Sequence, residues 1–171
     1  LVGQSVNNGS PTLKRLTMKS LSKLLSAFAL LCGSTFFVAQ AASAQSATAI
    51  FAGGCFWCVE ADFEKVKGVK GAVSGFAGGK KENPTYKQVT SGGTGHYEAV
   101  QITFDPAVVS ADTFLDLFFR SVDPTDAGGQ FCDRSDSYRI AIFATDSQIA
   151  VAEQAKAKAQ SDLGKKVVTP V

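Results

Sequence analysis

Cys55 is the residue of this sequence best placed to act as a nucleophile. It follows Gly53 and Gly54, which allow a sharp backbone turn, and it opens a segment with apolar residues at helical spacing. Because the N–H groups at a helix N-terminus favour a negative sulfur, we expect a reactive thiolate here. Cys58 follows one helical turn later, on the same side of the helix. The pair predicts a redox site in which Cys58 resolves a sulfenic acid formed on Cys55.

The same spacing has two structural interpretations, a stable disulfide or half of a metal site. The sequence contains no second cysteine pair or nearby histidine that would complete a zinc site, so we expect no metal. Cys132 is the third cysteine after residue 44, and three thiols cannot all pair with one another. At least one thiol is therefore free, bound elsewhere or cycling.

Glu98 is the second candidate group, because an acid rarely occupies the apolar face of a strand. Residues 96–104 alternate in polarity, and the face of Glu98 also carries Val100, Ile102 and Phe104. Burial would raise the pKa of the carboxyl and keep it protonated near neutral pH, as a general acid requires. The structural alternative is an ion pair with Arg139 or a lysine. A thiolate beside a protonated carboxyl suits the reduction of a sulfoxide, because the sulfur is attacked while the oxygen receives a proton.

Two aromatic residues, Phe56 and Trp57, lie between the first two cysteines. Phe56 fits the apolar helical stripe, so packing in the core is at least as well supported as contact with a substrate. Trp57 lies off the stripe, where it could shape an apolar pocket for a thioether methyl group. The only histidine, His96, lies in a glycine-rich turn, and we expect it to be structural.

The elements that must position these groups alternate between strands and helices. We expect strands at residues 47–52, 69–77, 96–104 and 138–144. Helical segments are expected at 56–66, near 86–89, from a cap at Ser110 or Asp112 to 122, and over an apolar stripe from Ile149 to Leu163. Strands separated by helices predict a mixed sheet with helices packed against it.

Residues 18–44 are typical of a cleavable signal peptide. Lys19 and Lys23 precede an apolar run at residues 24–38, and Ala42-Ser43-Ala44 resembles a cleavage site. The run is shorter than the roughly 20 apolar residues of a membrane-spanning helix. We therefore expect export to a periplasm-like compartment.

The remaining chain, residues 45–171, has the size of one ordinary domain. Residues 1–17 precede the only methionine, and we interpret them as an upstream segment that is not native. The excess of basic residues in the whole chain, 17 Lys and Arg against 15 Asp and Glu, comes from the first 44 residues. Nothing in the domain therefore favours nucleic acid or a membrane as a partner.

Several motifs in register resemble the A-type peptide methionine sulfoxide reductases. The resemblance covers nearly all of the chain from Ala49 onward. Its motifs are Gly54-Cys55-Phe56-Trp57, Gly75-Phe76-Ala77-Gly78-Gly79, Asn83-Pro84-Thr85-Tyr86, Gly95-His96-Tyr97-Glu98, Asp123-Pro124-Thr125, and Asp133 with Tyr138-Arg139.

The resemblance implies an α+β fold, a two-layer mixed-sheet roll with a ferredoxin-like core. It implies a monomeric repair enzyme of the oxidative stress response, without a cofactor, that reduces methionine S-sulfoxide and is recycled by thioredoxin or a similar dithiol. Cys55 would attack the sulfur and Glu98 would protonate the oxygen. The remaining roles it implies are oxygen binding by Tyr86, Asp133 and Tyr138, and methyl binding by Phe56 and Trp57.

The sequence departs from the family pattern at several positions. Ser137 replaces the usual Gln, Ile140 an often-seen Ser, and Phe131-Cys132 the more usual Gly-Asn before Asp133. The distal C-terminal cysteines of many relatives are absent, so we favour Cys58 as the resolving thiol, with Cys132 as the alternative or a second relay. The chain also stops before a Tyr-His-Gln segment of the family, which predicts a C-terminally truncated fragment.

Two other interpretations remain open on the residues alone. A thioredoxin-like disulfide exchanger also has a Cys-X-X-Cys pair at a helix start, but it would not need Glu98 on a core face. An exported binding domain with a structural disulfide between Cys55 and Cys58 would have no free thiol at Cys55.

Overall fold

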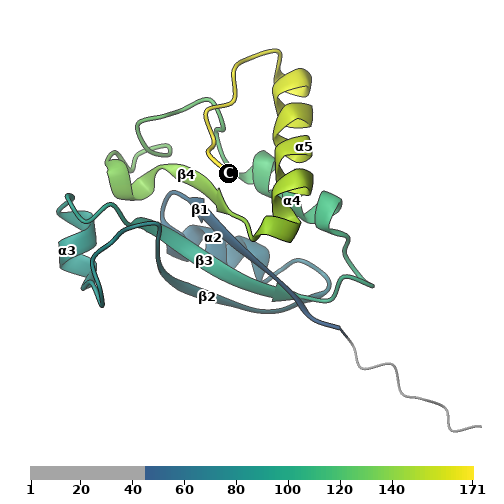
Figure 1. The fold of residues 1–171 in the computed structure, drawn as a ribbon, viewed down its shortest axis with the longest axis horizontal. Helices are drawn as coiled ribbons and strands as arrows, with labels where there is room; N and C mark the ends of the chain where they lie inside the picture. Colours follow the sequence, from purple (N-terminus) through teal and green to yellow (C-terminus); the bar gives the residue numbers. More distant parts are fainter. Residues whose placement is uncertain (1–44) are drawn as a thin grey trace, which may run out of the picture. The chain divides into compact units, whose positions relative to one another are not determined.

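The computed structural model describes residues 45–171 (Figure 1). The predicted upstream segment and signal peptide lie outside these residues. The elements follow in the order β1 (Ala47–Gly53), α2 (Phe56–Phe63), β2 (Val69–Ala77), α3 (Tyr86–Thr90), β3 (Tyr97–Phe104), α4 (Ala111–Ser121), the 3₁₀ turn η1 (Asp136–Tyr138), β4 (Ile140–Phe143) and α5 (Asp146–Leu163). None of the helices in this part of the chain is long and apolar enough to cross a membrane.

The four strands form one sheet in the order β2-β3-β1-β4. Strand β3 pairs antiparallel with both β1 and β2, and β1 pairs antiparallel with β4. Strands β1 and β2 are therefore parallel, but β3 lies between them, which is the split β-α-β arrangement of a ferredoxin-like fold. The predicted α+β class with this core is confirmed. The parallel neighbours expected of a mixed sheet do not occur among the described strands, because β3 inserts between the two strands that α2 connects.

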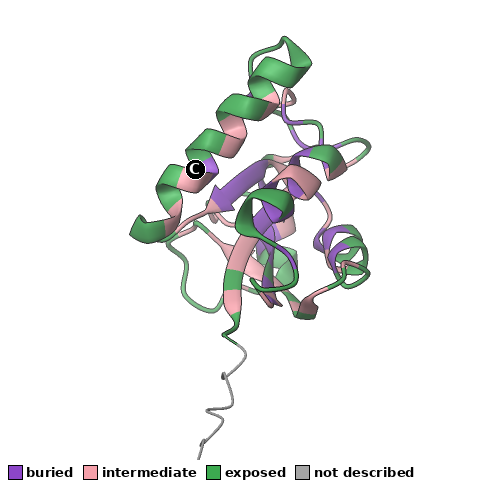
Figure 2. Cartoon of the chain, turned by 90° about the vertical axis from the view of Figure 1, so that its right-hand side faces the viewer, coloured by how far each residue is buried: buried purple, intermediate pink, exposed green. Residues whose placement is uncertain are grey.

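The main core lies between one face of the sheet and the helices (Figure 2). Strand β3 alternates as predicted, with Glu98, Val100, Ile102 and Phe104 all buried. Helix α4 is capped by Ser110, whose hydroxyl accepts the Thr113 N–H at 3.2 Å. Its buried residues are Phe114, Leu115, Phe118 and Phe119. Glu98 is therefore the acidic member of an otherwise apolar strand face.

Two expectations for the C-terminal half were wrong in detail. Tyr138 belongs to the 3₁₀ turn and not to the strand, which begins at Ile140. The ends of the predicted apolar stripe in α5, Ile149 and Leu163, are exposed. The reason is that α5 packs on the core only through its middle, where the contacting side chains are Val151, Ala152, Ala155 and Ala159.

Candidate active site

Cys55 lies at the junction between β1 and α2. It is the N-cap of α2, and its carbonyl oxygen accepts the N–H groups of Cys58 at 3.1 Å and Val59 at 3.3 Å. The predicted strand-turn-helix unit is thus present. Cys55 is half-buried, Cys58 is exposed, and both thiols are free. A hydrogen bond between their side chains is the largest cause that raises the pKa of the Cys58 thiol, so the two sulfurs are neighbours.

Gly54 holds the turn before Cys55 against a distant loop. Its φ of +90° favours glycine, and a Cβ added there would lie 2.7 Å from Cβ of Gln130. No side chain larger than hydrogen fits at this position. The nucleophile turn and the loop around Gln130 are therefore in direct contact.

Glu98 reaches the first turn of α2 from the centre of the sheet. Its side chain is only 1% exposed, and Oε2 accepts the backbone N–H of Phe56 at 3.1 Å. The other carboxyl oxygen, Oε1, is buried and has no hydrogen-bond partner. Burial is the main cause that raises the pKa of Glu98, the charge of Asp133 raises it further, and the Phe56 N–H partly opposes the rise. These causes favour the protonated carboxylic acid.

The ion-pair alternative for Glu98 is not observed. No salt bridge within residues 45–171 includes Glu98, and Arg139 instead lies 3.5 Å from Asp136, Nη2 to Oδ1. The guanidinium of Arg139 also lies over the ring of Tyr97, at 5.4 Å from its centroid. The acid is thus not neutralised by a cation in the described structure.

Tyr86, Asp133 and Tyr138 gather around Glu98 from three separate segments. The pKa of Tyr138 is raised by burial first, then by a hydrogen bond with Tyr86 and by the charge of Glu98. The charge of Asp133 also raises the pKa of Tyr138. The structure therefore brings together two hydroxyls and two carboxyl groups next to the cysteine pair. Residues that are far apart in the sequence thus form one polar cluster.

Aromatic rings line the same region. Phe56 stacks at about equal centroid distances on Trp57 (5.9 Å), Phe76 (5.9 Å) and Tyr86 (6.0 Å). Phe56 is buried, as its place on the helical stripe predicted, whereas Trp57 is 68% exposed. An apolar aromatic surface thus adjoins the polar cluster.

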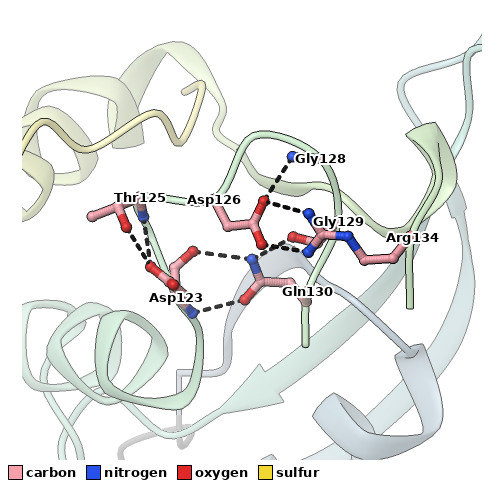
Figure 3. A network of polar contacts seen from close by, with 7 residues as sticks. All are labelled: Asp123, Thr125, Asp126, Gly128, Gly129, Gln130 and Arg134. Atoms are coloured by element: carbon pink, nitrogen blue, oxygen red, sulfur yellow. Dashed lines mark hydrogen bonds and ion pairs between the residues drawn. The ribbon is translucent and has the colours of Figure 1, made fainter. Parts of the chain in front are cut away.

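Gln130 organises the loop that contacts Gly54, and the sequence analysis missed it. Its buried amide accepts the Asp123 N–H at 2.7 Å and donates to the carbonyl oxygens of Asp123 at 3.0 Å and Gly129 at 2.7 Å (Figure 3). Nearby, Arg134 binds both carboxylate oxygens of Asp126. No periodicity marks a glutamine in a loop, so only its position between the Asp123-Pro124-Thr125 and Asp133 motifs could have indicated a role.

The departures from the family pattern lie in and after this loop. Gln130 and Asp133 exchange backbone hydrogen bonds of 3.0 and 2.9 Å, which leaves Phe131 and Cys132 exposed at the tip of a tight turn. The Ser137 hydroxyl is buried 2.8 Å from that of Ser135. Ile140, the last substituted position, is buried in the core.

His96 has the structural contacts expected of it. Its Nδ1 accepts the Gly79 N–H at 3.2 Å, and its Nε2 lies 2.9 Å from the Lys81 carbonyl oxygen. A neutral ring with the proton on Nε2 satisfies both contacts. Within residues 45–171, no three His, Cys, Asp or Glu side chains lie close enough together to hold a metal ion.

Comparison with known proteins gives consistent relationships. A family model described as peptide methionine sulfoxide reductase matches residues 47–171. Peptide methionine sulfoxide reductase MsrA 2 of Rhizobium meliloti is 47% identical over 150 residues, which cover 87% of this chain and 73% of that protein. MsrA 2 of Caulobacter vibrioides is 51% identical over 122 residues, which cover 71% of this chain and 62% of that protein.

Solved structures agree with these sequence relatives. The crystal structure of reduced Mxr1 from Saccharomyces cerevisiae has a TM-score of 0.70 and 30% identity, covering 75% of this chain and 76% of that one. Methionine sulfoxide reductase A of Corynebacterium diphtheriae has a TM-score of 0.64 and 29% identity, covering 72% and 62%. Mxr1 has also been solved in complex with Trx2, with a TM-score of 0.54 and 23% identity. The chain belongs to the peptide methionine sulfoxide reductase family.

Proposed function

We propose that this protein reduces methionine S-sulfoxide, free or within proteins, to methionine through the thiol of Cys55. The observation that carries the proposal is the contact between α2 and Glu98. The N–H of Phe56 occupies Oε2 of Glu98, so Oε1 is the oxygen left to carry and donate a proton. That proton donor adjoins the residue that follows Cys55. A nucleophile and an acid are thus held by one backbone contact.

The reaction can be written with its atoms in balance. The Cys55 thiolate attacks the sulfoxide sulfur while Glu98 protonates the sulfoxide oxygen. The oxygen then passes to the cysteine, so that methionine leaves and Cys55 becomes a sulfenic acid. The sulfoxide is reduced by two electrons and Cys55 is oxidised by two.

The neighbouring groups supply binding contacts in this scheme. Tyr86, Asp133 and Tyr138 hold the sulfoxide oxygen, directly or through water. The exposed ring of Trp57 and the buried ring of Phe56 receive the methyl group. The stacking of Phe56 on Tyr86 places these two sets of groups next to each other.

Cys58 is the proposed resolving thiol. It lies one helical turn after Cys55, in the first turn of α2, within reach of a sulfenic acid there. Attack by Cys58 releases water and forms the Cys55–Cys58 disulfide. Cys132 is the alternative, since it is exposed and adjoins Asp133, whose charge acts on Cys58.

A thioredoxin-like dithiol is the proposed reductant of that disulfide. The yeast relative Mxr1 has been solved in complex with Trx2, which supports a partner of this kind. The exposure of Cys58 supports access by such a protein. We further propose a monomeric enzyme that acts in protein repair.

We also propose that the protein is exported to a periplasm-like space. The pattern of residues 18–44 supports this proposal. The measurement is the intact mass of the protein recovered from the producing cells. A mass that corresponds to cleavage after Ala44 is expected, and retention of residues 18–44 on the protein would refute the proposal.

The proposed reaction is tested by incubating the reduced protein with each epimer of methionine sulfoxide and dithiothreitol. We expect methionine from the S epimer alone, and no turnover by Cys55→Ser. Glu64→Gln, at an exposed site on the same side of the sheet, serves as a control with unchanged activity. A folded wild-type protein that reduces neither epimer would overturn the proposal.

A further inference from the structure

Phe131 has two energetically unfavourable features that seldom occur together in one surface residue. Its φ of +50° lies in the region that favours glycine, and its ring is 70% exposed. A bulky aromatic here therefore adds backbone strain and exposed apolar surface without adding to the core. Strained residues of this kind gather at binding and catalytic sites.

The turn that carries Phe131 is held firmly at its base. Gln130 and Asp133 bond to each other through their backbones, and the buried Gln130 amide is fixed by three further hydrogen bonds (Figure 3). Gly129, with a φ of +141°, packs where a Cβ would lie 2.2 Å from the Asp133 carbonyl oxygen. The tip is thus presented from a rigid support.

The same turn adjoins the reaction site at both of its ends. Gln130 packs on Gly54, the residue before Cys55. Asp133 acts electrostatically on Glu98, Tyr138 and Cys58. Phe131 lies between these two ends. The ring therefore belongs to a turn whose base contacts the residue before Cys55.

We propose that Phe131 is a specificity-determining residue that binds the apolar side chains flanking an oxidised methionine in peptide substrates. This inference rests on the proposed reductase activity. Together with the exposed rings of Trp57 and Tyr86, Phe131 gives the site apolar surface beyond the sulfoxide itself. Such flanking residues become accessible in unfolded or damaged protein segments. Free methionine sulfoxide has no flanking residues and would not use the contact.

The test compares Phe131→Gly with wild type on three probes, with dithiothreitol as reductant. The probes are N-acetyl-methionine S-sulfoxide, a pentapeptide with the sulfoxide flanked by leucines, and one with it flanked by glycines. We expect kcat/KM to fall about fivefold for the leucine-flanked peptide, through KM, and to stay unchanged for the other two. Phe131→Leu, which keeps an apolar side chain, should retain most of the preference.

Misfolding of Phe131→Gly would not reproduce a loss of activity that is limited to the leucine-flanked peptide. Because glycine relieves the positive φ, Phe131→Gly should raise Tm by about 3 °C. Val108→Ala removes another exposed apolar side chain, near Gly68 beyond the other end of α2, and should leave all three probes unchanged.

Each contrary outcome has a distinct meaning. Equal effects on all three probes, or no effect on any, would overturn the inference while leaving the reductase activity in place. In a second assay with thioredoxin as reductant, a rise in KM for thioredoxin, with no change for the leucine-flanked peptide under dithiothreitol, would also overturn it and would assign the ring to reductant docking. Failure of the wild type on N-acetyl-methionine S-sulfoxide would instead refute the proposed function.

Discussion

The backbone N–H of Phe56 donates a hydrogen bond of 3.1 Å to Oε2 of Glu98. This bond ties the first residue of α2 to the central strand β3, and it fixes which carboxyl oxygen is left free. The N-terminus of the helix thus faces both the thiol and the acid.

Replacement of Glu98 by Gln should remove the proton donor and leave its shape. We expect kcat for methionine S-sulfoxide to fall by about 10²- to 10⁴-fold, the usual contribution of a general acid. Wild-type activity should decline as pH rises through the raised pKa of Glu98, because the acid then loses its proton. The variant should lack that alkaline decline. A pH profile of kcat for both proteins makes the measurement, and an identical decline in the variant would exclude Glu98 as its source.

The same substitution should change how stability depends on pH. Below pH 4.5, the ordinary value for Glu, the carboxyl is protonated in both folded and unfolded chains. Above it, the Glu98 carboxyl ionises in the unfolded chain but keeps its proton in the folded chain. The free energy of unfolding of wild type therefore falls until the pH passes the pKa of Glu98 in the folded chain. Each unit of the raised pKa corresponds to about 1.4 kcal/mol. In urea unfolding, the free energy of unfolding of Glu98→Gln should rise relative to that of wild type across this pH window. Glu64→Gln, at an exposed site, should show the same pH dependence as wild type.

The two candidate resolving thiols can be separated by single substitutions. Cys58→Ser should release one methionine per enzyme and then stall when thioredoxin is the reductant, because its sulfenic acid has no adjacent thiol. Cys132→Ser should continue to cycle. Product is counted in a single-turnover and a multiple-turnover experiment. Undiminished cycling by Cys58→Ser together with stalling by Cys132→Ser would assign the role to Cys132.

Gly54→Ala tests the packing between the nucleophile turn and the loop. The new Cβ would collide with Gln130 at a positive φ, so we expect a loss of about 2 kcal/mol or more in the free energy of unfolding. Turnover should fall as well, because the turn also sets the position of Cys55. Gly71→Ala is the matched control, since a Cβ there meets nothing within 4 Å. Equal stabilities of the two variants by denaturant unfolding would contradict this account.

Local patterns in the sequence were sufficient to predict most elements, Cys55 and Glu98, whereas Tyr86, Asp133 and Tyr138 were indicated only by the family resemblance. The alternation of β3 identified the buried face on which Glu98 lies, and the two glycines before Cys55 marked the helix start. These signals are local, because each depends on neighbours within one strand or one turn. The insertion of β3 between β1 and β2 followed only from the ferredoxin-like core that the resemblance implied, since strand order depends on contacts between distant segments and no local pattern shows it.

The loop at residues 123–134 shows the same limit more strongly. Its order depends on the buried side-chain amide of Gln130, which forms hydrogen bonds with the backbone of Asp123, seven residues away. Hydropathy does not indicate such a contact. The positive φ of Phe131 is equally hidden, because only the closed turn imposes it. The family motifs located Asp133, but the contacts of the neighbouring residues were revealed only by the fold.

Because β3 lies in the middle of the sheet, we expect this strand to be less mobile than the exposed turn of Phe131 and Cys132. Strand β3 pairs with both β1 and β2 from Val100 to Phe104, and at Glu98 it pairs with β2 alone, so the amide protons of residues 100–104 should exchange with solvent only when the sheet opens. Phe131 and Cys132, at the tip of an exposed turn, should exchange early. The proton donor can then stay in register while the tip of the turn, Phe131 and Cys132, adjusts to peptides of differing sequence.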